Sequence, residues 1–592
     1  MFAGLHCRRI RAKVSVMLRT RIHVSFTARL FILIMAFVLS LSLIPAQPVH
    51  AAAITVNTNL DVVAVNGLCS LREAVANANN DAATNADCTA GSGADTITFN
   101  FAGTVTLGGT EISVTSAITI DEGAGNVTIS GNNASRVFNV SGSGALTLNG
   151  LTIQNGSATA AGGCIVVGNN TSLTFNNGTL QNCATTNSGG AVGIVSGTTS
   201  ITITNSTLQN NTAGINGGAI SQPGSTSNLS ISNSTFSGNR SGSIGSAQGG
   251  AIIYLTNTTG SFSITNSTFD SNLAQSVATL SRGGAIYFSA SSGITGTISG
   301  STFSNNQAFN ASTENNGGAI YKNGIGALSI SSSVFTGNSS ASLGGAFYSN
   351  QGLLTITGSR IESNTAASGG AYYTVSGSSS GGDSLTGSCI VNNSDTAIVD
   401  IEVGSDMTAT GNWWGTSWGP QITEVGGGSA ISGGDSIVGD GVAAADSEAD
   451  VNVGLTSAGS ADGSSVPTGD WLASAPIINS VACASVSWTP PGETASDVMI
   501  SPAAFNVSEG ANANYTITRT GSTTSALTVT FNITQGTGTV NADYTLTPAS
   551  GLISAQSGNN VAVTIPAGSA TLNISMAATN DVDAEADNTL TL

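Results

Sequence analysis

The chain of 592 residues is poor in the side chains that carry most enzyme chemistry. Charged residues make up 8 % of it and aromatic residues 5 %, whereas an average soluble domain has about 25 % charged residues. All three histidines, His6, His23 and His50, lie within the first 50 residues. The rest of the chain therefore offers no Ser–His catalytic pair and no histidine ligand for a metal.

What the chain has instead is glycine, at 75 residues, together with many Ser, Thr and Asn residues. This composition excludes an array of helical repeats. Disorder is excluded as well, because 40 % of the residues are apolar and they recur with a period. The composition indicates an all-β chain of short strands and many turns.

The N-terminal segment has the pattern of a secretory signal peptide. Half of the 14 basic residues precede residue 30, residues 30–45 are apolar, and the sequence VHA at 49–51 places small residues where a signal peptidase reads them. The alternative is a retained membrane anchor. Because the apolar run is shorter than the about 20 residues of a spanning helix, we expect cleavage after Ala51 and no membrane span thereafter.

Cleavage at this point would leave a strongly acidic protein. The seven basic residues that remain stand against 32 acidic ones, which gives a net charge of −25. Nucleic acid and anionic lipid are poor partners for such a surface. We expect a secreted or cell-surface bacterial protein.

Six cysteines follow the signal, an even number that allows up to three disulfides in an exported chain. Cys69 and Cys88 flank a short loop and are the favoured pair. Cys164 and Cys183 occupy different positions of neighbouring repeats, so their pairing is less favoured, and the connectivity of these two with Cys389 and Cys483 stays open. Zinc is not expected, because the chain has no CxxC motif.

A short phrase recurs nine times, and each copy is centred on an apolar anchor residue. Successive anchors lie 26 to 34 residues apart: Ile153, Leu180, Leu208, Phe236, Phe269, Phe303, Phe335, Ile361 and Ile390. Three residues after the anchor, seven of the nine copies have Asn: Asn211, Asn239, Asn272, Asn306, Asn338, Asn364 and Asn393. A Gly-Gly doublet followed by Cys164 or by Ala separates successive anchors.

The segments before most anchors alternate apolar and polar residues, as in LSISNSTF at 229–236. This alternation predicts strands with one buried face, and a self-similar unit of this length predicts stacked units. Propeller blades need four strands in about 40 residues, more than these units supply. The sequence therefore predicts a right-handed parallel β-helix with two or three strands per unit, and with the extra length of long units in loops on one side.

This arrangement predicts two interior rows. Phe236, Phe269, Phe303 and Phe335 should stack on one another, and the Asn residues should form a parallel row at a turn, where Asn tolerates the conformation and can bond to its copies. The Gly-Gly doublet should supply backbone freedom at a corner.

Three motifs resemble known families of surface β-helix proteins. The alternation of GGA[I/V] with FxxN resembles the repeats of chlamydial polymorphic membrane proteins. CSLREAV at 69–75 resembles the CSLREA motif that opens many secreted bacterial β-helix proteins, and GNWWGTSWGP at 411–420 resembles a phrase near the C-terminal end of such helices. We see no segment like the outer-membrane barrel that ends the polymorphic membrane proteins.

The last part of the chain resembles a Calx-beta domain, an immunoglobulin-like sandwich. The matching segments are 505–521, 541–551 and 565–592. The resemblance implies Ca²⁺ binding by acidic residues at strand ends: Glu509, Asp543, Asp581, Asp583, Glu585 and Asp587. Asn588 stands where the family usually has Glu, and the chain stops before the expected last strand, so we expect an incomplete domain.

These patterns divide the chain into six parts. The expected parts are a signal peptide (1–51), an N-terminal cap with the first coils (52–145), the repeat β-helix (146–420), its C-terminal end with a Gly/Asp-rich loop (421–480), a linker (481–497) and the truncated Calx-beta-like domain (498–592).

Few residues break the repeat in a way that suggests catalysis. Asp400 and Glu402 alternate on one strand and could act as the paired carboxylates of a glycosidase, but a solvated outer face is the simpler interpretation. Asp270 and Glu362 share one position of the repeat three units apart, roughly 14 Å along a stack of strands, too far for either glycosidase geometry.

Other candidates are better explained by structure. The basic residues Arg136, Arg240, Arg282, Lys322 and Arg360 fall at different positions of the repeat and build no single groove. Arg72 and Glu73 lie in the one short helix expected, which should cover the first coil. The aromatic side chains Trp413, Trp414 and Trp418 could stack on a sugar, but a hydrophobic plug at the far end of the helix is preferred.

The sequence thus predicts an exported, non-catalytic, adhesin-like or structural protein with no catalytic residues. Its partner would be an extracellular glycan or protein that contacts the long wall of Ser, Thr and Asn. One alternative is a polysaccharide lyase or glycoside hydrolase on a β-helix scaffold, which would need an acidic cluster with a nearby Arg or Lys on one face. Another is a calcium-dependent structural spacer.

Overall fold

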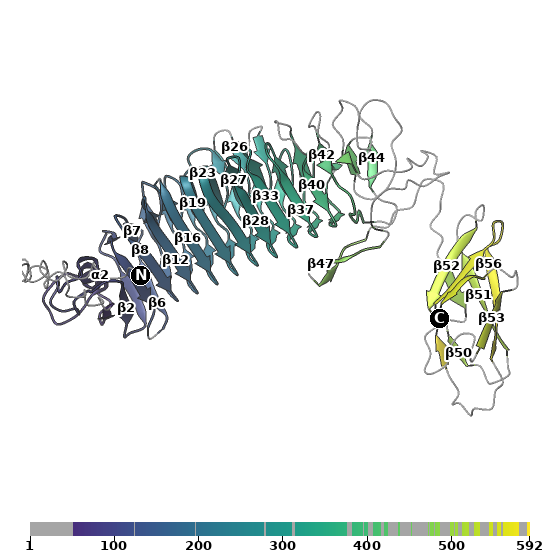
Figure 1. Cartoon of the computed structure of the whole chain (residues 1–592), viewed down its shortest axis with the longest axis horizontal. Coiled ribbons are helices and arrows are strands. Elements are labelled where there is room, and N and C mark those ends of the chain that lie inside the picture. The colour runs from purple at the N-terminus through teal and green to yellow at the C-terminus, as the bar shows by residue number, and fades with distance from the viewer. Residues whose placement is uncertain are drawn as a thin grey trace, which may run out of the picture.

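The computed structural model describes residues 51–400 apart from 124, 196, 278–279, 311–313, 376–381 and 395 (Figure 1). Beyond residue 400 it describes shorter segments: 407–415, 420–423, 436–438, 451–452, 472, 474–478, 480–485, 498–501, 504–506, 512–519, 526–532, 544–548, 553–557, 560–578 and 589–591. Among all these residues no helix is long and apolar enough to cross a membrane.

From residue 53 onward the chain winds into a right-handed parallel β-helix, so the predicted fold is confirmed (Figure 1). Its faces are a 25-stranded wide sheet, an 11-stranded anchor sheet that holds the anchor residues, and a 7-stranded narrow sheet. A coil such as 171–194 has four short strands, not two or three, because it enters the wide sheet twice.

The strands of one half of the wide sheet are β1 (Ala53–Val56), β2 (Asp95–Phe99), β5 (Ala117–Asp121), β8 (Ala145–Asn149), β12 (Thr171–Asn176), β16 (Thr198–Thr204), β19 (Ile220–Ser232), β23 (Ile252–Thr265), β28 (Thr295–Ser299), β33 (Ala327–Ser331), β37 (Leu354–Thr357), β40 (Ser384–Thr386) and β43 (Met407–Thr408). Those of the other half are β4 (Ile112–Val114), β7 (Phe138–Val140), β11 (Ile165–Val167), β15 (Val192–Ile194), β27 (Ile286–Ala290), β32 (Ile320–Asn323), β36 (Phe347–Ser349), β39 (Tyr372–Thr374) and β42 (Thr396–Asp400), and the sheet ends with β44 (Gln421–Thr423), β45 (Ser436–Val438) and β46 (Val451–Asn452). In β19 and β23 the two halves form one continuous strand.

The anchor sheet consists of β3 (Gly103–Thr106), β6 (Val127–Ser130), β9 (Thr152–Gln154), β13 (Thr179–Gln181), β17 (Thr207–Gln209), β20 (Thr235–Ser237), β24 (Thr268–Asp270), β29 (Thr302–Ser304), β34 (Val334–Thr336), β38 (Arg360–Glu362) and β41 (Cys389–Val391). The narrow sheet consists of β10 (Ser157–Ala158), β14 (Ala184–Thr185), β18 (Thr212–Ala213), β21 (Arg240–Ser241), β25 (Leu273–Ala274), β30 (Gln307–Ala308) and β35 (Ser339–Ser340).

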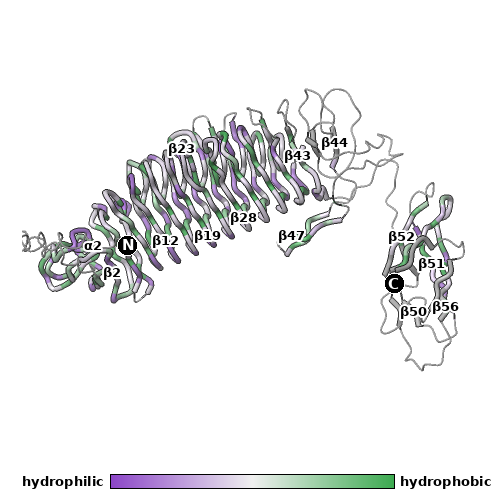
Figure 2. Tube along the Cα trace, viewed as in Figure 1, coloured by the Kyte–Doolittle hydropathy of each residue, from purple (hydrophilic) through white to green (hydrophobic). Residues whose placement is uncertain are grey.

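The predicted phenylalanine row is confirmed. Phe236, Phe269, Phe303 and Phe335 are fully buried, and successive ring centroids lie 4.8, 4.8 and 4.7 Å apart with nearly parallel planes. Figure 2 shows the alternation that produces this interior, with apolar and polar residues succeeding each other along each coil.

The predicted asparagine row is confirmed too, although these Asn residues do not themselves adopt the turn conformation that was expected of them. Asn239 donates its side-chain N–H to Asn272 Oδ1 at 2.9 Å, and its backbone N–H donates to the same oxygen at 3.1 Å. The left-handed turn conformation belongs to the preceding residue, as in Asn210 (φ 54°) before Asn211. The row therefore repeats for its hydrogen bonds, while its neighbours repeat for their backbone conformation.

The Gly-Gly doublet is a corner, as predicted. Its first residue has positive φ, for example 77° at Gly189. At the second residue a Cβ on Gly250 would collide with the carbonyl oxygen of Gly284 in the next coil. Both positions therefore require glycine, for different reasons.

The extra length of the long units lies on one side, as predicted. In three consecutive units the doublet begins 13 or 14 residues after the anchor rather than 8 or 9. These insertions form a three-stranded arm sheet, β22 (Ala247–Gln248), β26 (Leu280–Arg282) and β31 (Glu314–Asn316).

The structure contains three disulfides. Cys69–Cys88 is the pair favoured by the sequence, with Cα atoms 4.9 Å apart. Cys389–Cys483 has Cα atoms 6.0 Å apart and ties a hairpin, β47 (Ile477–Ile478) and β48 (Val481–Ala482), to β41.

The pair Cys164–Cys183, which the sequence disfavoured, is bonded, with Cα atoms 5.4 Å apart. Different positions of the repeat meet here because the asparagine row faces the residue after the Gly-Gly doublet across the narrow interior. A Cβ on Gly156, the row member one coil before Cys183, would collide with Cys164 Sγ. The cysteine pair thus lies where the asparagine row begins. Cys183 still donates its backbone N–H to Asn211 Oδ1 at 3.0 Å.

The described segments after residue 498 are all β and antiparallel, which agrees with the predicted class. One sheet has the order β49 (Val498–Ser501), β51 (Asn512–Arg519), β56 (Thr571–Ala578) and β53 (Tyr544–Pro548). The others pair β52 (Leu527–Asn532), β55 (Asn560–Ile565) and β54 (Ile553–Ser557), and β50 (Ala504–Asn506) with β57 (Thr589–Thr591).

Candidate functional site

The longest regular surface of the molecule is the outer face of the wide sheet. Because the strands there pair in parallel, with register shifts among the described residues only at Gly224/Thr226 and Thr396/Ile398, each coil places one side chain of a kind above the last, about 4.8 Å apart. Its first row has Thr or Ser in twelve successive strands: Thr96, Thr119, Thr147, Thr174, Thr202, Ser230, Ser263, Thr297, Ser329, Thr355, Ser384 and Thr408.

A second row runs beside it, two residues later in each strand. It consists of Thr98, Asp121, Asn149, Asn176, Thr204, Ser232, Thr265, Ser299, Ser331, Thr357 and Thr386. Its amides bond along the row, with Asn149 donating to Asp121 at 2.5 Å and Asn176 donating to Asn149 at 3.0 Å. We call these two rows the hydroxyl face; Asp121 is its one charged residue.

A shorter row lies on the outside of the anchor sheet. Eight threonines stand in register: Thr104, Thr128, Thr152, Thr179, Thr207, Thr235, Thr268 and Thr302. Val334, Arg360 and Cys389 continue the row, so the threonine pattern stops there. The hydroxyl face is therefore the longer uninterrupted surface.

Asp270 lies on the outside of the anchor sheet and is held by neighbours. Its carboxylate accepts hydrogen bonds from the hydroxyls of Ser304 at 2.6 Å and Ser271 at 3.0 Å, and from the Asn305 amide at 3.1 Å. Burial alone would raise the pKa of this carboxyl, but these three bonds bring the pKa below its usual value. Asp270 is thus an ionised acceptor and a poor proton donor.

Glu362 is separated from Asp270 by the coils of Ser304 and Thr336, as the repeat predicted. It pairs with Arg360 at 2.6 Å and lies beside Cys389 and Cys483, close enough for the three groups to hold a metal ion. Because the two sulfurs are bonded to each other, they offer no thiolate, and a metal site is not formed.

The other predicted acidic candidates cannot be placed as a site. Asp400 is the last residue of β42, and Glu402 lies outside the described residues. All six residues of the implied calcium site also lie outside them: Glu509, Asp543, Asp581, Asp583, Glu585 and Asp587.

The tryptophan phrase splits in two rather than forming one plug. Trp414 is fully buried and belongs to the main core at the end of the helix. Trp413 points the other way, packs with Ile478 and the Cys389–Cys483 pair, and donates its indole N–H to the Ala484 carbonyl at 2.7 Å. Consecutive strand residues face opposite sides, which the sequence analysis overlooked. Trp418 lies outside the described residues.

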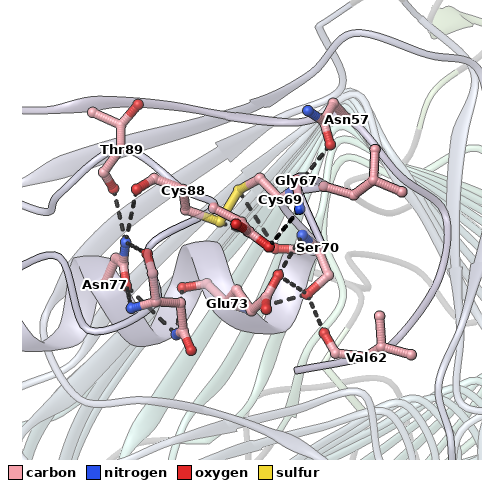
Figure 3. The surroundings of a disulfide bond; sticks show 12 residues. Asn57, Val62, Gly67, Cys69, Ser70, Glu73, Asn77, Cys88 and Thr89 are labelled. Atoms are coloured by element: carbon pink, nitrogen blue, oxygen red, sulfur yellow. Dashed lines mark hydrogen bonds between the residues drawn. A yellow bond between two sulfur atoms is a disulfide. The ribbon is translucent and has the colours of Figure 1, made fainter. Parts of the chain in front are cut away.

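The N-terminal helix α2 (Leu71–Asn80) contacts β1, β2, β4 and β5 at the start of the β-helix. Glu73 closes a capping box, since its carboxylate accepts the Ser70 N–H at 3.0 Å while the Ser70 hydroxyl accepts from the Glu73 N–H (Figure 3). Arg72 pairs with Asp61 at 2.8 Å. Both residues thus have structural partners.

One of the basic residues that were weighed as a groove lies inside the helix instead. Lys322 in β32 points inward, fully buried, in register between Phe288 and Ser349. Its ammonium donates to the Gly324 carbonyl at 2.9 Å. Burial lowers the pKa of Lys322 to about 8, against the opposing effect of the Asp383 charge.

Asp383 is buried in the same part of the interior. It accepts hydrogen bonds from the Tyr372 hydroxyl at 2.5 Å, the Thr374 hydroxyl at 3.1 Å and the Leu354 N–H at 2.6 Å. The alternation of GGAIYKN indicates an inward Lys322, but nothing in the sequence places Asp383 opposite it. Both charged side chains of this cluster are buried.

An aromatic row lies outside the other half of the wide sheet. Tyr287, Tyr321, Tyr348 and Tyr373 stack at 5.1, 4.8 and 5.8 Å between ring centroids. Arg282 from the arm sheet lies over Tyr321 at 5.1 Å from the ring centroid and pairs with Glu314 at 2.6 Å. The first three tyrosines are buried, so the row is a small second core.

The comparisons with known proteins agree with the repeat. The Chlamydia polymorphic membrane protein repeat matches residues 300–322 and 332–350, which include two anchors and two Gly-Gly doublets. This match indicates a surface-associated β-helix protein. No curated protein matches the chain.

Among solved structures, the crystal structure of the enzymatically active domain of tailspike protein 4 from bacteriophage CBA120 matches at 11 % identity with a TM-score of 0.19. The match covers 84 % of this chain and 63 % of the tailspike chain, so this chain spans less than two thirds of that domain. A similarity this low carries no argument about function.

Proposed function

We propose that this chain is an exported, non-catalytic surface protein that binds an extended, uncharged ligand, such as a neutral glycan, along the hydroxyl face. The observation that carries this proposal is the unbroken register of Ser and Thr over twelve strands. Hydroxyl groups can donate and accept, and a ligand with its own repeat could meet one of them in every coil. Many weak contacts along such a surface add up to useful avidity.

The absence of charge in most of the two rows favours an uncharged ligand. A uronic-acid polymer would need basic residues in register, and the hydroxyl face has none among the described residues. Among the described acidic residues of the coils, Asp270, Glu314, Glu362 and Asp383 are each engaged by hydrogen bonds or an ion pair. These contacts support binding without turnover over the alternative of a polysaccharide lyase or glycoside hydrolase.

The test is binding of the purified exported chain to a panel of neutral and uronic polysaccharides. Two lysines on the hydroxyl face, Thr202→Lys with Ser263→Lys, should abolish binding. The matched control places lysines on the anchor sheet of the same two coils, Thr207→Lys with Thr268→Lys, and should bind like the wild type. Release of reducing ends or unsaturated products, abolished by Asp400→Ala or Glu402→Ala, would instead establish the enzyme.

A second proposal concerns the Calx-beta-like region, whose resemblance implies that Ca²⁺ is held by the six acidic residues named above. Carboxylates are the ligands that Ca²⁺ prefers, and binding should stabilise this region by mass action. Calorimetric melting of the full chain in Ca²⁺ and in chelator should show one transition that rises with Ca²⁺. Asp581→Asn with Asp583→Asn should remove that rise, and no rise in the wild type would refute the site.

A further inference from the structure

The segment 60–68, which follows β1, exposes a concentration of apolar side chains. Fourteen large apolar side chains are exposed among the described residues, and five of them lie in these nine positions: Leu60, Val62, Val63, Val65 and Leu68. Val65 is 87 % exposed and Val63 60 %. Single exposed apolar residues are ordinary, but a contiguous group marks a contact surface. We call this segment the apolar loop.

Polar groups beneath the apolar loop fix its backbone. The Val62 carbonyl accepts a hydrogen bond from the Ser70 hydroxyl at 2.6 Å (Figure 3). The Ala64 N–H donates to the Glu73 carboxylate at 2.9 Å. Glu73 is itself fixed by the capping box of α2. The buried carboxylate therefore holds both the helix and the loop.

The far end of the loop is fixed in the same way. The N–H groups of Asn66 and Gly67 donate to the Asp87 carboxylate at 2.6 and 2.9 Å. The Cys69–Cys88 disulfide links the chain segment that follows Gly67 to the segment that contains Asp87 (Figure 3). The loop presents its valines on a rigid support, so little conformational entropy is lost when they meet a partner.

The position of the loop in the chain indicates what that partner is. Seven residues, 46–52, separate the apolar run 30–45 from the start of β1, and they can span at most about 25 Å. If residues 30–45 lie in a bilayer, β1 therefore begins near its surface, and the apolar loop begins four residues after β1 ends. We propose that the apolar loop inserts its valines and leucines into the interface of that bilayer.

The charges of the apolar loop indicate which lipid headgroups it contacts. The loop contains no Lys or Arg to attract anionic headgroups, and its one charged residue, Asp61, is paired with Arg72 at 2.8 Å. The contact should form with zwitterionic lipid and should be insensitive to salt. The lipid contact orients the axis of the β-helix relative to the membrane while the N-terminal segment is still attached. The proposed glycan binding neither requires nor implies this contact.

The test uses the full chain, with residues 1–50 verified by mass, in Cys7→Ser background so that an added cysteine is the one free thiol. An environment-sensitive fluorophore is attached through Val65→Cys or, as control, through Val277→Cys, another exposed valine of the coils at 67 %. With phosphatidylcholine vesicles the label at position 65 should shift to the blue and brighten several-fold, unchanged by salt, and the label at 277 should not respond. Adding Val63→Ser should reduce the response at position 65.

Two results would overturn the proposal. One is no change at position 65, or an equal change at both positions, which would mean that the loop does not contact lipid selectively. The other is a blue shift without vesicles that grows with protein concentration, which would assign the loop to contact with a second copy of the chain. Mapping of the three disulfides in each labelled variant confirms that the fold is intact.

Discussion

Neighbouring residues of each anchor-sheet strand face opposite sides of the sheet, and the residues on the two sides repeat for different reasons. Phe269 points inward and stacks on Phe236 and Phe303, so its identity is dictated by its own copies. Thr268, its neighbour, points outward beside copies of itself. Packing explains the monotony inside the helix, but solvent imposes no such demand on the outside.

The outer rows therefore need another explanation. Part of it is physical, because Thr suits strands and like charges stacked in register would repel each other. These preferences would still allow alternating charges or amides along the rows. A first row of only Ser and Thr over twelve successive strands, between Ala53 and Asn452, exceeds what the fold requires, and we propose that ligand binding accounts for it.

The largest expected loss of stability comes from truncating a side chain of the interior phenylalanine row. Phe269→Ala should lower the free energy of unfolding by about 3–5 kcal/mol, because stacked neighbours on both sides prevent the cavity from collapsing. Denaturant unfolding of the purified chain measures it. Thr268→Ala, on the other side of the same strand, should change stability by less than about 0.5 kcal/mol, and equal effects would contradict the comparison.

The asparagine row should come next. Asn272→Ala removes the oxygen that accepts both the backbone and the side-chain N–H of Asn239, leaving two buried donors unpaired at a cost of about 2–4 kcal/mol. Asn266→Gly is the control, since this exposed corner residue with φ 48° has glycine at the matching position of the next repeat, Gly300. A loss at Asn266 as large as that at Asn272 would show that turns, not the buried row, limit stability.

The buried lysine should oppose stability rather than support it. The pKa of Lys322 is about 8 in the folded chain and 10.5 is its ordinary value, so between these values the unfolded chain binds the extra proton. Stability should therefore rise as pH increases from 8 to about 9, before buried tyrosines of raised pKa, such as Tyr254 and Tyr287, begin to ionise in the unfolded chain and oppose the rise. Lys322→Met should raise the free energy of unfolding by about 1–3 kcal/mol at pH 7, the residual Asp383 charge limiting the gain.

The same substitution should remove the rise between pH 8 and about 9, which urea unfolding at several pH values would detect. Arg240→Met, at an exposed position of the narrow sheet, should leave the pH profile of the wild type unchanged. A wild-type profile that is flat over this range would mean that Lys322 keeps its ordinary pKa.

The sequence predicted what repetition imposes and missed what single contacts decide. Anchors, asparagine row and glycine corners follow from the period, and the structure confirms them. The Cys164–Cys183 bond depends on two rows meeting across the interior, and Asp383, whose charge acts on Lys322, comes from a coil two turns away, so neither can be derived from spacing along one row. Trp413 and Trp414 were grouped although strand alternation separates them.

The most direct test of the central claim compares the two outer faces for binding while stability is held constant. The pair Thr202→Lys and Ser263→Lys and the pair Thr207→Lys and Thr268→Lys change the same coils by the same chemistry. We predict equal unfolding midpoints for the two variants, loss of neutral-polysaccharide binding in the first, and wild-type binding in the second. Wild-type binding by both variants, or equal loss in both, would contradict the assignment of the hydroxyl face.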